Sequence, residues 1–197
     1  LKGSLLITLY ENLRWKTISP QGFREEMLAY LPNESNSLLF SMALSYLGDC
    51  QRIFPSDSCP LEEALWKIVT TNPVSQHRLQ AFRLYRSIAD SEEAVQRLYT
   101  LWQERKAPKD CTLSESDYIG LSYMLAMHLP EKADKIIATQ LSRIQNPDRK
   151  KEYQFISPSV SPRKAERDSV FASLLIAGNR RVEPWASSAL ANLNHRL

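Results

Sequence analysis

The chain has 197 residues and a formal net charge of +3, and 43% of its residues are hydrophobic while 24% are charged. These values are ordinary for a globular protein, and the five Gly and eleven Pro are too few for a low-complexity chain. No apolar run approaches the roughly 18 residues of a membrane span, so we expect no insertion into a membrane. The chain starts without Met and in the middle of a helical pattern, which suggests a fragment or a processed product.

Helical periodicity dominates the chain. Residues 3–16 are predicted to form a first helix, with an apolar stripe that extends to Trp15. Later helices are expected to begin where Ser, Asn or Asp can accept hydrogen bonds from free backbone N–H groups, or where Pro fits the first turn. These predicted starts are Ser19-Pro20, Ser58 to Pro60, Ser75, Asp90-Ser91, Ser114 with Asp117, Pro130, Asn146-Pro147 and Ser161-Pro162.

No stretch shows convincing strand alternation, although residues 154–160 are a candidate for a short extended segment. The pattern predicts an all-α protein of about ten or eleven helices. Successive helices with short links pack antiparallel, which favours stacked helical hairpins in a HEAT/armadillo-like α-solenoid. A compact irregular bundle is the alternative.

The His and Cys residues do not show the spacing of a metal site. They are His77, His128, His195, Cys50, Cys59 and Cys111. None belongs to an HExxH, HxxxH or CxxC motif, and His77 is predicted to lie at an exposed helix start. Buried free thiols are expected, although Cys50 and Cys59 could bridge across a turn. Since the phosphate-loop and GxSxG motifs are also missing, the sequence predicts no catalysis by this chain alone.

Paired carboxylates recur at predicted helix starts. The pairs are Glu25-Glu26, Glu62-Glu63 and Glu92-Glu93. Negative charge in the first turn complements the helix dipole, so we interpret these residues as structural.

A basic segment covers residues 143–167, with seven Lys or Arg against three Asp or Glu and a local net charge of +4. Such a segment can contact nucleic acid, an acidic partner or a carboxylate. Arg149, with Lys151 or Arg167, lies near a predicted helix start, where free N–H groups and a guanidinium can converge on an anion. The alternative is a solvated helix face. The carboxylates available nearby are Asp148, Glu152 and Glu166.

The segment NRRVEPW, residues 179–185, combines a turn, a candidate ion pair and a large aromatic. We predict a structural staple in which Glu183 pairs with Arg180 or Arg181 and Trp185 is buried. In that case Trp185→Ala would cost about 3–5 kcal/mol, as large-to-small core substitutions do. The alternative is that Trp185 belongs to an interface.

Several segments together carry a family resemblance. They are LYENL (9–13), LPNESNSLL (31–39), LEEALW (61–66), RLYTLW (97–102), LSESDYIGLSYMLAMH (113–128), NPDRKKEYQFISPSVS (146–161), RDSVFASL (167–174) and NRRVEPWASSALANL (179–193). In this order they resemble the C-terminal helical domain of bacterial zinc aminopeptidases of the aminopeptidase N type. NPDR, RDxxF and NRxxEPW are the specific part. The family's HHPLR-like end reads Asn194-His195-Arg196-Leu197 here and lacks the Pro.

In that family a separate upstream domain holds the zinc through HExxH and a distant Glu, and zinc-activated water attacks the first peptide bond. The resemblance implies that residues 1–197 are a single helical domain that covers the active site and shapes a peptide chamber. It implies no catalytic or metal residue here, with zinc bound outside this chain. The implied partners are peptide substrates and the upstream catalytic domain, in the cytoplasm or periplasm of a bacterium.

Under this resemblance, the anion near Arg149 would be the C-terminal carboxylate of a peptide, held with Lys151 or Arg167. Two other hypotheses stay open. One is a stand-alone helical-repeat scaffold that binds a protein. The other is a nucleic-acid binder, which we do not expect, because the segment 143–167 lacks interleaved exposed aromatics and any nucleic-acid motif.

Overall fold

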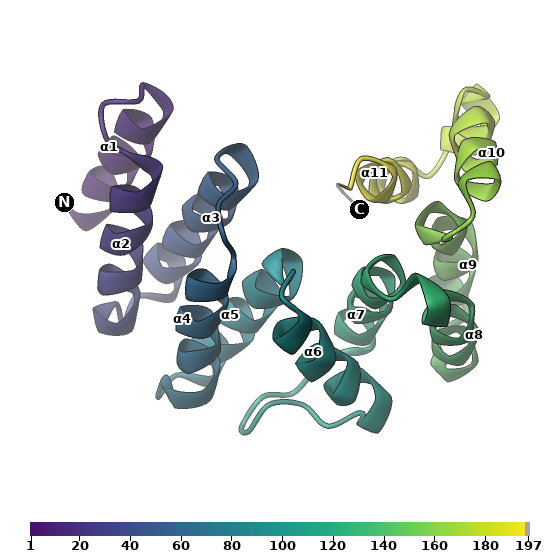
Figure 1. Cartoon of the computed structure of the whole chain (residues 1–197), viewed down its shortest axis with the longest axis horizontal. Helices are drawn as coiled ribbons and strands as arrows, with labels where there is room; N and C mark the ends of the chain where they lie inside the picture. Colours follow the sequence, from purple (N-terminus) through teal and green to yellow (C-terminus); the bar gives the residue numbers. More distant parts are fainter. Residues whose placement is uncertain (196–197) are drawn as a thin grey trace. The chain divides into compact units, whose positions relative to one another are not determined.

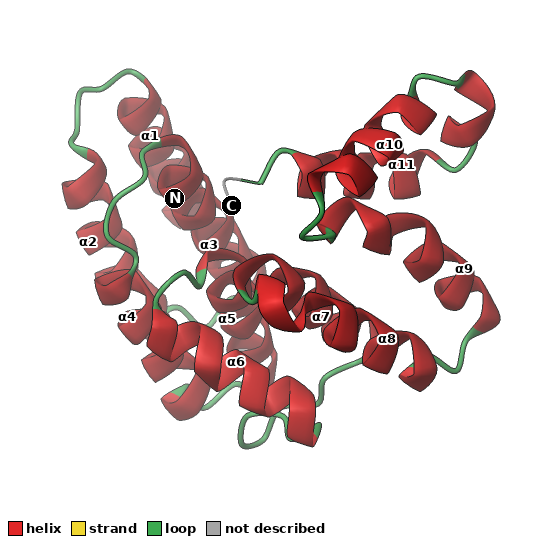
Figure 2. Cartoon of the chain, turned by 45° about the vertical axis from the view of Figure 1, so that its right-hand side comes forward, coloured by secondary structure: helices red, strands yellow, loops and turns green. Residues whose placement is uncertain are grey.

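The computed structural model describes residues 1–195, and in that range it contains helices and turns but no strand (Figures 1 and 2). The predicted all-α helical-repeat fold is therefore confirmed. The described α-helices are α1 (Lys2–Arg14), α2 (Pro20–Tyr30), α3 (Ser37–Ile53), α4 (Cys59–Thr71), α5 (Ser75–Ile88), α6 (Glu92–Glu104), α7 (Glu115–His128), α8 (Ala133–Arg143), α9 (Pro147–Ile156), α10 (Lys164–Leu174) and α11 (Glu183–Leu193). Short 3-10 helices are η1 (Leu31–Asn33), η2 (Pro130–Lys132), η3 (Ser157–Val160) and η4 (Ala177–Arg180).

The chain divides into two compact units. Unit 1 comprises Leu1–Arg97 with Arg105–Thr112, and unit 2 comprises Leu98–Glu104 with Leu113–Leu197. In unit 1, α3 packs against α1, α2 and α5, and α5 forms a helical hairpin with α4. In unit 2, α7 pairs with α8, while α9, α10 and α11 pack around η3.

Local capping explains many of the helix starts. Ser19 accepts a hydrogen bond from the N–H of Gly22 at the start of α2. Ser114 and Asp117 form the predicted capping box of α7, in which each side chain accepts from the other residue's backbone N–H. Asn146 caps α9, with Pro147 in its first turn. These starts were predictable because cap and helix are neighbours in the sequence.

Two predicted caps differ from the structure by one or two residues. Ser75 is the first residue of α5, and the N-cap is Val74, which makes no side-chain cap. At Ser161-Pro162 the Ser hydroxyl accepts from the N–H of Arg163, but α10 begins only at Lys164. Such tight turns satisfy backbone groups without starting a helix at the same position.

Residues 154–160 are not extended. α9 continues through Ile156, and the 3-10 helix η3 follows directly. Tyr153 and Ile156 are buried on one face of α9, which explains why helix is favoured over an unpaired extended segment.

The core of each unit consists of large apolar side chains. In unit 1 the fully buried ones include Phe23, Met27, Leu31, Phe40, Leu47, Leu65, Phe82 and Tyr85. In unit 2 they include Leu121, Leu125 and Tyr153. Trp15 does not belong to the predicted stripe, because its side chain is 78% exposed just beyond the end of α1.

All three cysteines are free thiols, so Cys50 and Cys59 do not form a bridge. Cys50 is buried as predicted, whereas Cys59 is exposed at the first position of α4. None of the helices in residues 1–195 is long and apolar enough to cross a membrane.

Candidate functional site

The start of α9 is where the sequence predicts an anion site. The side-chain oxygen of Asn146 accepts hydrogen bonds from the N–H groups of Asp148 and Arg149, at 2.9 and 3.1 Å. These are two of the free donors that a bound anion would use. The remaining attraction for an anion must therefore come from side chains.

The guanidinium of Arg149 has an acidic partner on another helix. Its Nη1 lies 3.4 Å from Oε2 of Glu115, the first residue of α7, and the Arg149 side chain is 42% exposed. The other carboxylate oxygen of Glu115 accepts from the N–H of Gln145 at 3.0 Å. Glu115 is not one of the nearby carboxylates that the sequence offered, because it lies on a preceding helix.

The other two predicted binding residues have partners of their own. Lys151 lies 4.0 Å from Asp148 on the same helix, and its side chain is 71% exposed. Arg167 is half-buried in α10, and its Nη1 donates to the backbone carbonyl of Ser161 at 2.6 Å. The partners of Arg149, Lys151 and Arg167 are thus three separate groups, namely Glu115, Asp148 and the carbonyl of Ser161.

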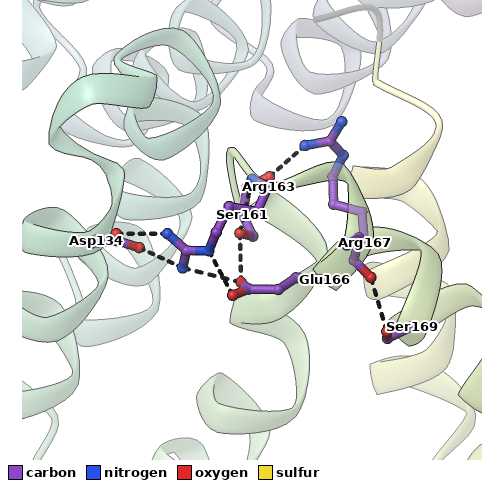
Figure 3. A network of polar contacts seen from close by, with 7 residues as sticks. Asp134, Ser161, Arg163, Glu166, Arg167 and Ser169 are labelled. Carbon is purple, nitrogen blue, oxygen red and sulfur yellow. Dashed lines mark hydrogen bonds and ion pairs between the residues drawn. The ribbon is translucent and has the colours of Figure 1, made fainter.

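Figure 3 shows a polar network centred on Arg163, which lies close to Arg167 in the sequence. Arg163 donates from Nη1 and Nη2 to both carboxylate oxygens of Asp134 on α8, at 2.8 and 2.9 Å. Its Nε also donates to Glu166, which accepts from the hydroxyl of Ser161 as well. These hydrogen bonds hold the pKa values of Asp134 and Glu166 below their ordinary range. Two carboxylates thus balance the charge of Arg163.

Of the staple predicted at residues 179–185, the structure of residues 1–195 shows an aromatic contact of Trp185 but not the ion pair of Glu183. The ring of Trp185 lies 5.8 Å from that of Phe155, at an interplanar angle of 48°. Trp185 is half-buried, and both rings lie on elements that border a small core of Leu174, Ala186 and Ala189. No hydrogen bond or ion pair in the described residues joins Glu183 to Arg180 or Arg181. All three side chains are exposed.

The chain end Asn194-His195-Arg196-Leu197 lies only partly within the described range, and Arg196 and Leu197 fall outside it. The ring of His195 lies 6.0 Å from that of His128, near the end of α7.

His77 is a buried polar residue that the sequence analysis misplaced. Its side chain is fully buried and stacks on Phe40, with ring centroids 4.0 Å apart. Its Nε2 lies 3.1 Å from the hydroxyl of Ser37, while Nδ1 has no hydrogen-bond partner. Burial lowers the pKa of His77 below its ordinary value, which favours the neutral ring. Helical spacing could have predicted this burial, because His77 lies on the same face of α5 as the buried residues Ala81 and Tyr85.

A buried carboxylate lies near this histidine. Glu34 accepts from the hydroxyl of Tyr30, the N–H of Asn36 and the ammonium of Lys2. The hydrogen bond from Tyr30 contributes most, and together these donors lower the pKa of Glu34 to about 2. This cluster is thus a set of satisfied structural bonds around an ionised carboxylate, apart from the unpartnered Nδ1 of His77.

Glu62 has a structural role that involves a second helix. Its Oε1 accepts from the N–H groups of Asp90 and Ser91, at 2.7 and 3.1 Å, just before α6. Burial acts to raise the pKa of Glu62, but the hydrogen bonds from Ser91 and Asp90 outweigh it and hold this pKa below its ordinary value. The carboxylate therefore organises the start of α6 from α4.

Within the described residues, no group of three His, Cys, Asp or Glu side chains is arranged to hold a metal ion. No family model, no curated protein and no solved structure matches the chain.

Proposed function

We propose that this chain is an accessory helical domain of a zinc-dependent aminopeptidase, which covers the active site and shapes the chamber for the peptide. The zinc and the residues that activate water would belong to another domain of the parent protein. The observation that carries the proposal is the resemblance of three segments, NPDR, RDxxF and NRxxEPW, within residues 146–185.

Each of the three segments makes a local hydrogen bond within unit 2. Asn146 of NPDR caps α9, and Arg167 of RDxxF donates to the carbonyl of Ser161. Asn179 of NRxxEPW donates to the carbonyl of Ser173 at 2.9 Å. These hydrogen bonds fix the local conformation of each segment within unit 2.

The decisive test is the longer reading frame that encodes this chain. We expect an HExxH motif with a distant Glu upstream of Leu1, and an intact protein that hydrolyses aminoacyl p-nitroanilides until a zinc chelator is added. An upstream region without HExxH would refute the proposal, as would an intact protein whose activity is indifferent to the chelator.

Within this proposal, Arg149 is the residue best placed to meet the carboxylate of a peptide, because its side chain remains 42% exposed beside Glu115. Lys151 and Arg167 are weaker candidates. Lys151 is a flexible surface cation, and Arg167 is committed to a backbone carbonyl. A peptide carboxylate would have to compete with Glu115 for the guanidinium.

A stand-alone scaffold that binds a protein is the second candidate function. The observation that favours it is a group of large apolar side chains exposed near the end of α10. A reading frame that lacks any peptidase domain, together with specific capture of a protein through that group, would favour the scaffold over the aminopeptidase domain.

A further inference from the structure

Unit 2 exposes a run of large apolar side chains where α10 ends and α11 begins. The exposed fractions are 54% for Phe171, 70% for Leu175, 62% for Ile176 and 43% for Val182. We call these four residues the α10 apolar surface. Single exposed apolar residues are ordinary, whereas an exposed apolar group marks a candidate interaction surface.

The geometry of α10 places part of this surface on one helix face. Phe171 and Leu175 are four residues apart, so their side chains are neighbours on the helix. The preceding positions on this face, Lys164 and Asp168, form an ion pair of 2.6 Å and make a neutral edge. Behind the surface, Leu174 is buried in the small core with residues of α11, so the exposed side chains rest on packed structure.

The charge beside the surface is positive. Arg180 and Arg181 lie between Ile176 and Val182, both are exposed, and neither has a hydrogen bond or ion pair within residues 1–195. The nearest acidic residue in the sequence is Glu183, which lies in the first turn of α11, where it complements the helix dipole. A partner that covers the apolar side chains would therefore meet two guanidinium groups that have no counter-charge among residues 1–195.

These features distinguish between the possible occupants. A second copy using the same surface would bring four arginines together, which like-charge repulsion opposes. An anionic lipid surface is usually recognised by clusters of about 4–8 basic residues, whereas Lys164 on this face is paired with Asp168, so Arg180 and Arg181 are the cations that accompany the surface. An amphipathic helix with an apolar stripe and acidic flanks satisfies both the apolar side chains and the guanidiniums.

We propose that the α10 apolar surface, with Arg180 and Arg181, is a docking site for an acidic amphipathic helix of a partner polypeptide. Phe171 and Leu175 supply the apolar contact, and the two arginines select acidic over basic flanks. This inference does not depend on the aminopeptidase proposal, since it uses no zinc, peptide chamber or catalytic domain.

The test uses the 197-residue chain and two fluorescein-labelled helical peptides that share one leucine stripe. One peptide carries glutamates on both flanks, and the other carries lysines at the same positions. Fluorescence anisotropy should show saturable binding of the acidic peptide and a dissociation constant at least about tenfold weaker for the basic one.

Three variants complete the test. Phe171→Ser with Leu175→Ser should weaken binding of the acidic peptide by about tenfold or more, as loss of apolar anchors does. The control Leu38→Ser removes a leucine that is 76% exposed in unit 1 and should leave binding unchanged. Arg180→Glu with Arg181→Glu should reverse the preference, so that the basic peptide binds more tightly.

The proposal is overturned if both peptides bind equally, if the Leu38 control loses as much affinity as the Phe171/Leu175 variant, or if charge reversal leaves the preference unchanged. It is also overturned if neither peptide binds while phosphatidylglycerol vesicles do, with loss in the same variants, because the surface would then recognise lipid. The circular dichroism spectrum of each variant should match that of the parent chain. A loss of binding then results from the changed surface and not from unfolding.

Discussion

The indole Nε1 of Trp102 donates a hydrogen bond of 2.8 Å to Oε1 of Gln140, and both side chains are buried in unit 2. The guanidinium of Arg143 lies 4.8 Å from the centre of a Trp102 ring, and its Nη1 donates to the backbone carbonyl of Trp102. This arrangement ties the second half of α6 to α8. A buried amide of this kind stabilises a fold only while its partner is present.

We therefore predict a strong coupling between Trp102 and Gln140. Trp102→Phe leaves a buried amide oxygen without a donor and should reduce the free energy of unfolding by about 1–3 kcal/mol. Gln140→Met should reduce the free energy of unfolding by a similar amount, because it leaves the buried indole N–H of Trp102 without an acceptor. The double variant should lose less than the sum of the single losses, by about 1 kcal/mol, in urea unfolding. Strictly additive losses would contradict the coupling.

Trp185→Ala should destabilise the chain by less than the 3–5 kcal/mol expected for a buried tryptophan. The ring is half-buried and contacts Phe155, so we expect a loss of roughly 2 kcal/mol in the free energy of unfolding. Trp15→Ala is the matched control, because that side chain is 78% exposed and should change stability by no more than about 0.5 kcal/mol. Equal melting curves for the two variants would place Trp185 outside the packed structure of this chain.

The buried His77 should make stability depend on pH. Its pKa is lowered by burial in the folded chain, with Glu34 acting in the opposite direction, while the unfolded chain takes up the proton near pH 6.5. As pH falls below that value, the unfolded state binds more protons than the folded state, so stability should decline as pH falls below 6.5. His77→Phe should flatten this decline in urea titrations. A decline of the same size in the variant would assign it to other groups.

Glu34 should contribute in a separate and more acidic range. Because its pKa is about 2 in the folded chain against an ordinary value of 4.5, its stabilising effect should be complete above pH 4.5 and lost as pH falls toward 2. Glu34→Gln should reduce stability at pH 7 and make it less sensitive to pH below 4.5. Acid titrations monitored by circular dichroism would show this, and an unchanged acid transition would rule it out.

Arg149 and Glu115 allow substrate binding to be separated from structure. If the parent protein is the aminopeptidase that we propose, Arg149→Ala in the intact protein should raise the KM for tripeptides and spare an uncharged aminoacyl amide, because only the tripeptide offers a carboxylate. Glu115→Ala removes the same ion pair but leaves the guanidinium, so it should not raise the tripeptide KM. Stability should change by about 0–1 kcal/mol in both variants. Equal KM changes in the two would mean that the ion pair matters only for structure.

The isolated chain should neither retain zinc nor hydrolyse aminoacyl reporters, because it has no HExxH motif. Dialysis followed by metal analysis and a chromogenic assay would check this. Stoichiometric zinc after dialysis, or turnover that a chelator abolishes, would show that a site exists in this chain.

The sequence determined the parts of the structure whose causes are local. Ser19, Ser114 and Asn146 could be identified as caps because the N–H groups they accept from lie two or three residues away. Apolar residues at helical spacing likewise indicated helix, and the all-α class followed. Local patterns failed at residues 154–160, where a Pro- and Ser-rich stretch continues as helix and 3-10 helix.

Tertiary structure decided which partners the polar side chains bind, because those partners lie far away along the chain. Glu62 caps a helix that starts about thirty residues later, and Arg149 pairs with a residue 34 positions earlier. The position of His77 at a helix start indicates exposure, whereas packing against Phe40 buries its side chain completely. Burial and long-range pairing depend on how helices pack, and helical periodicity alone does not specify which helices meet.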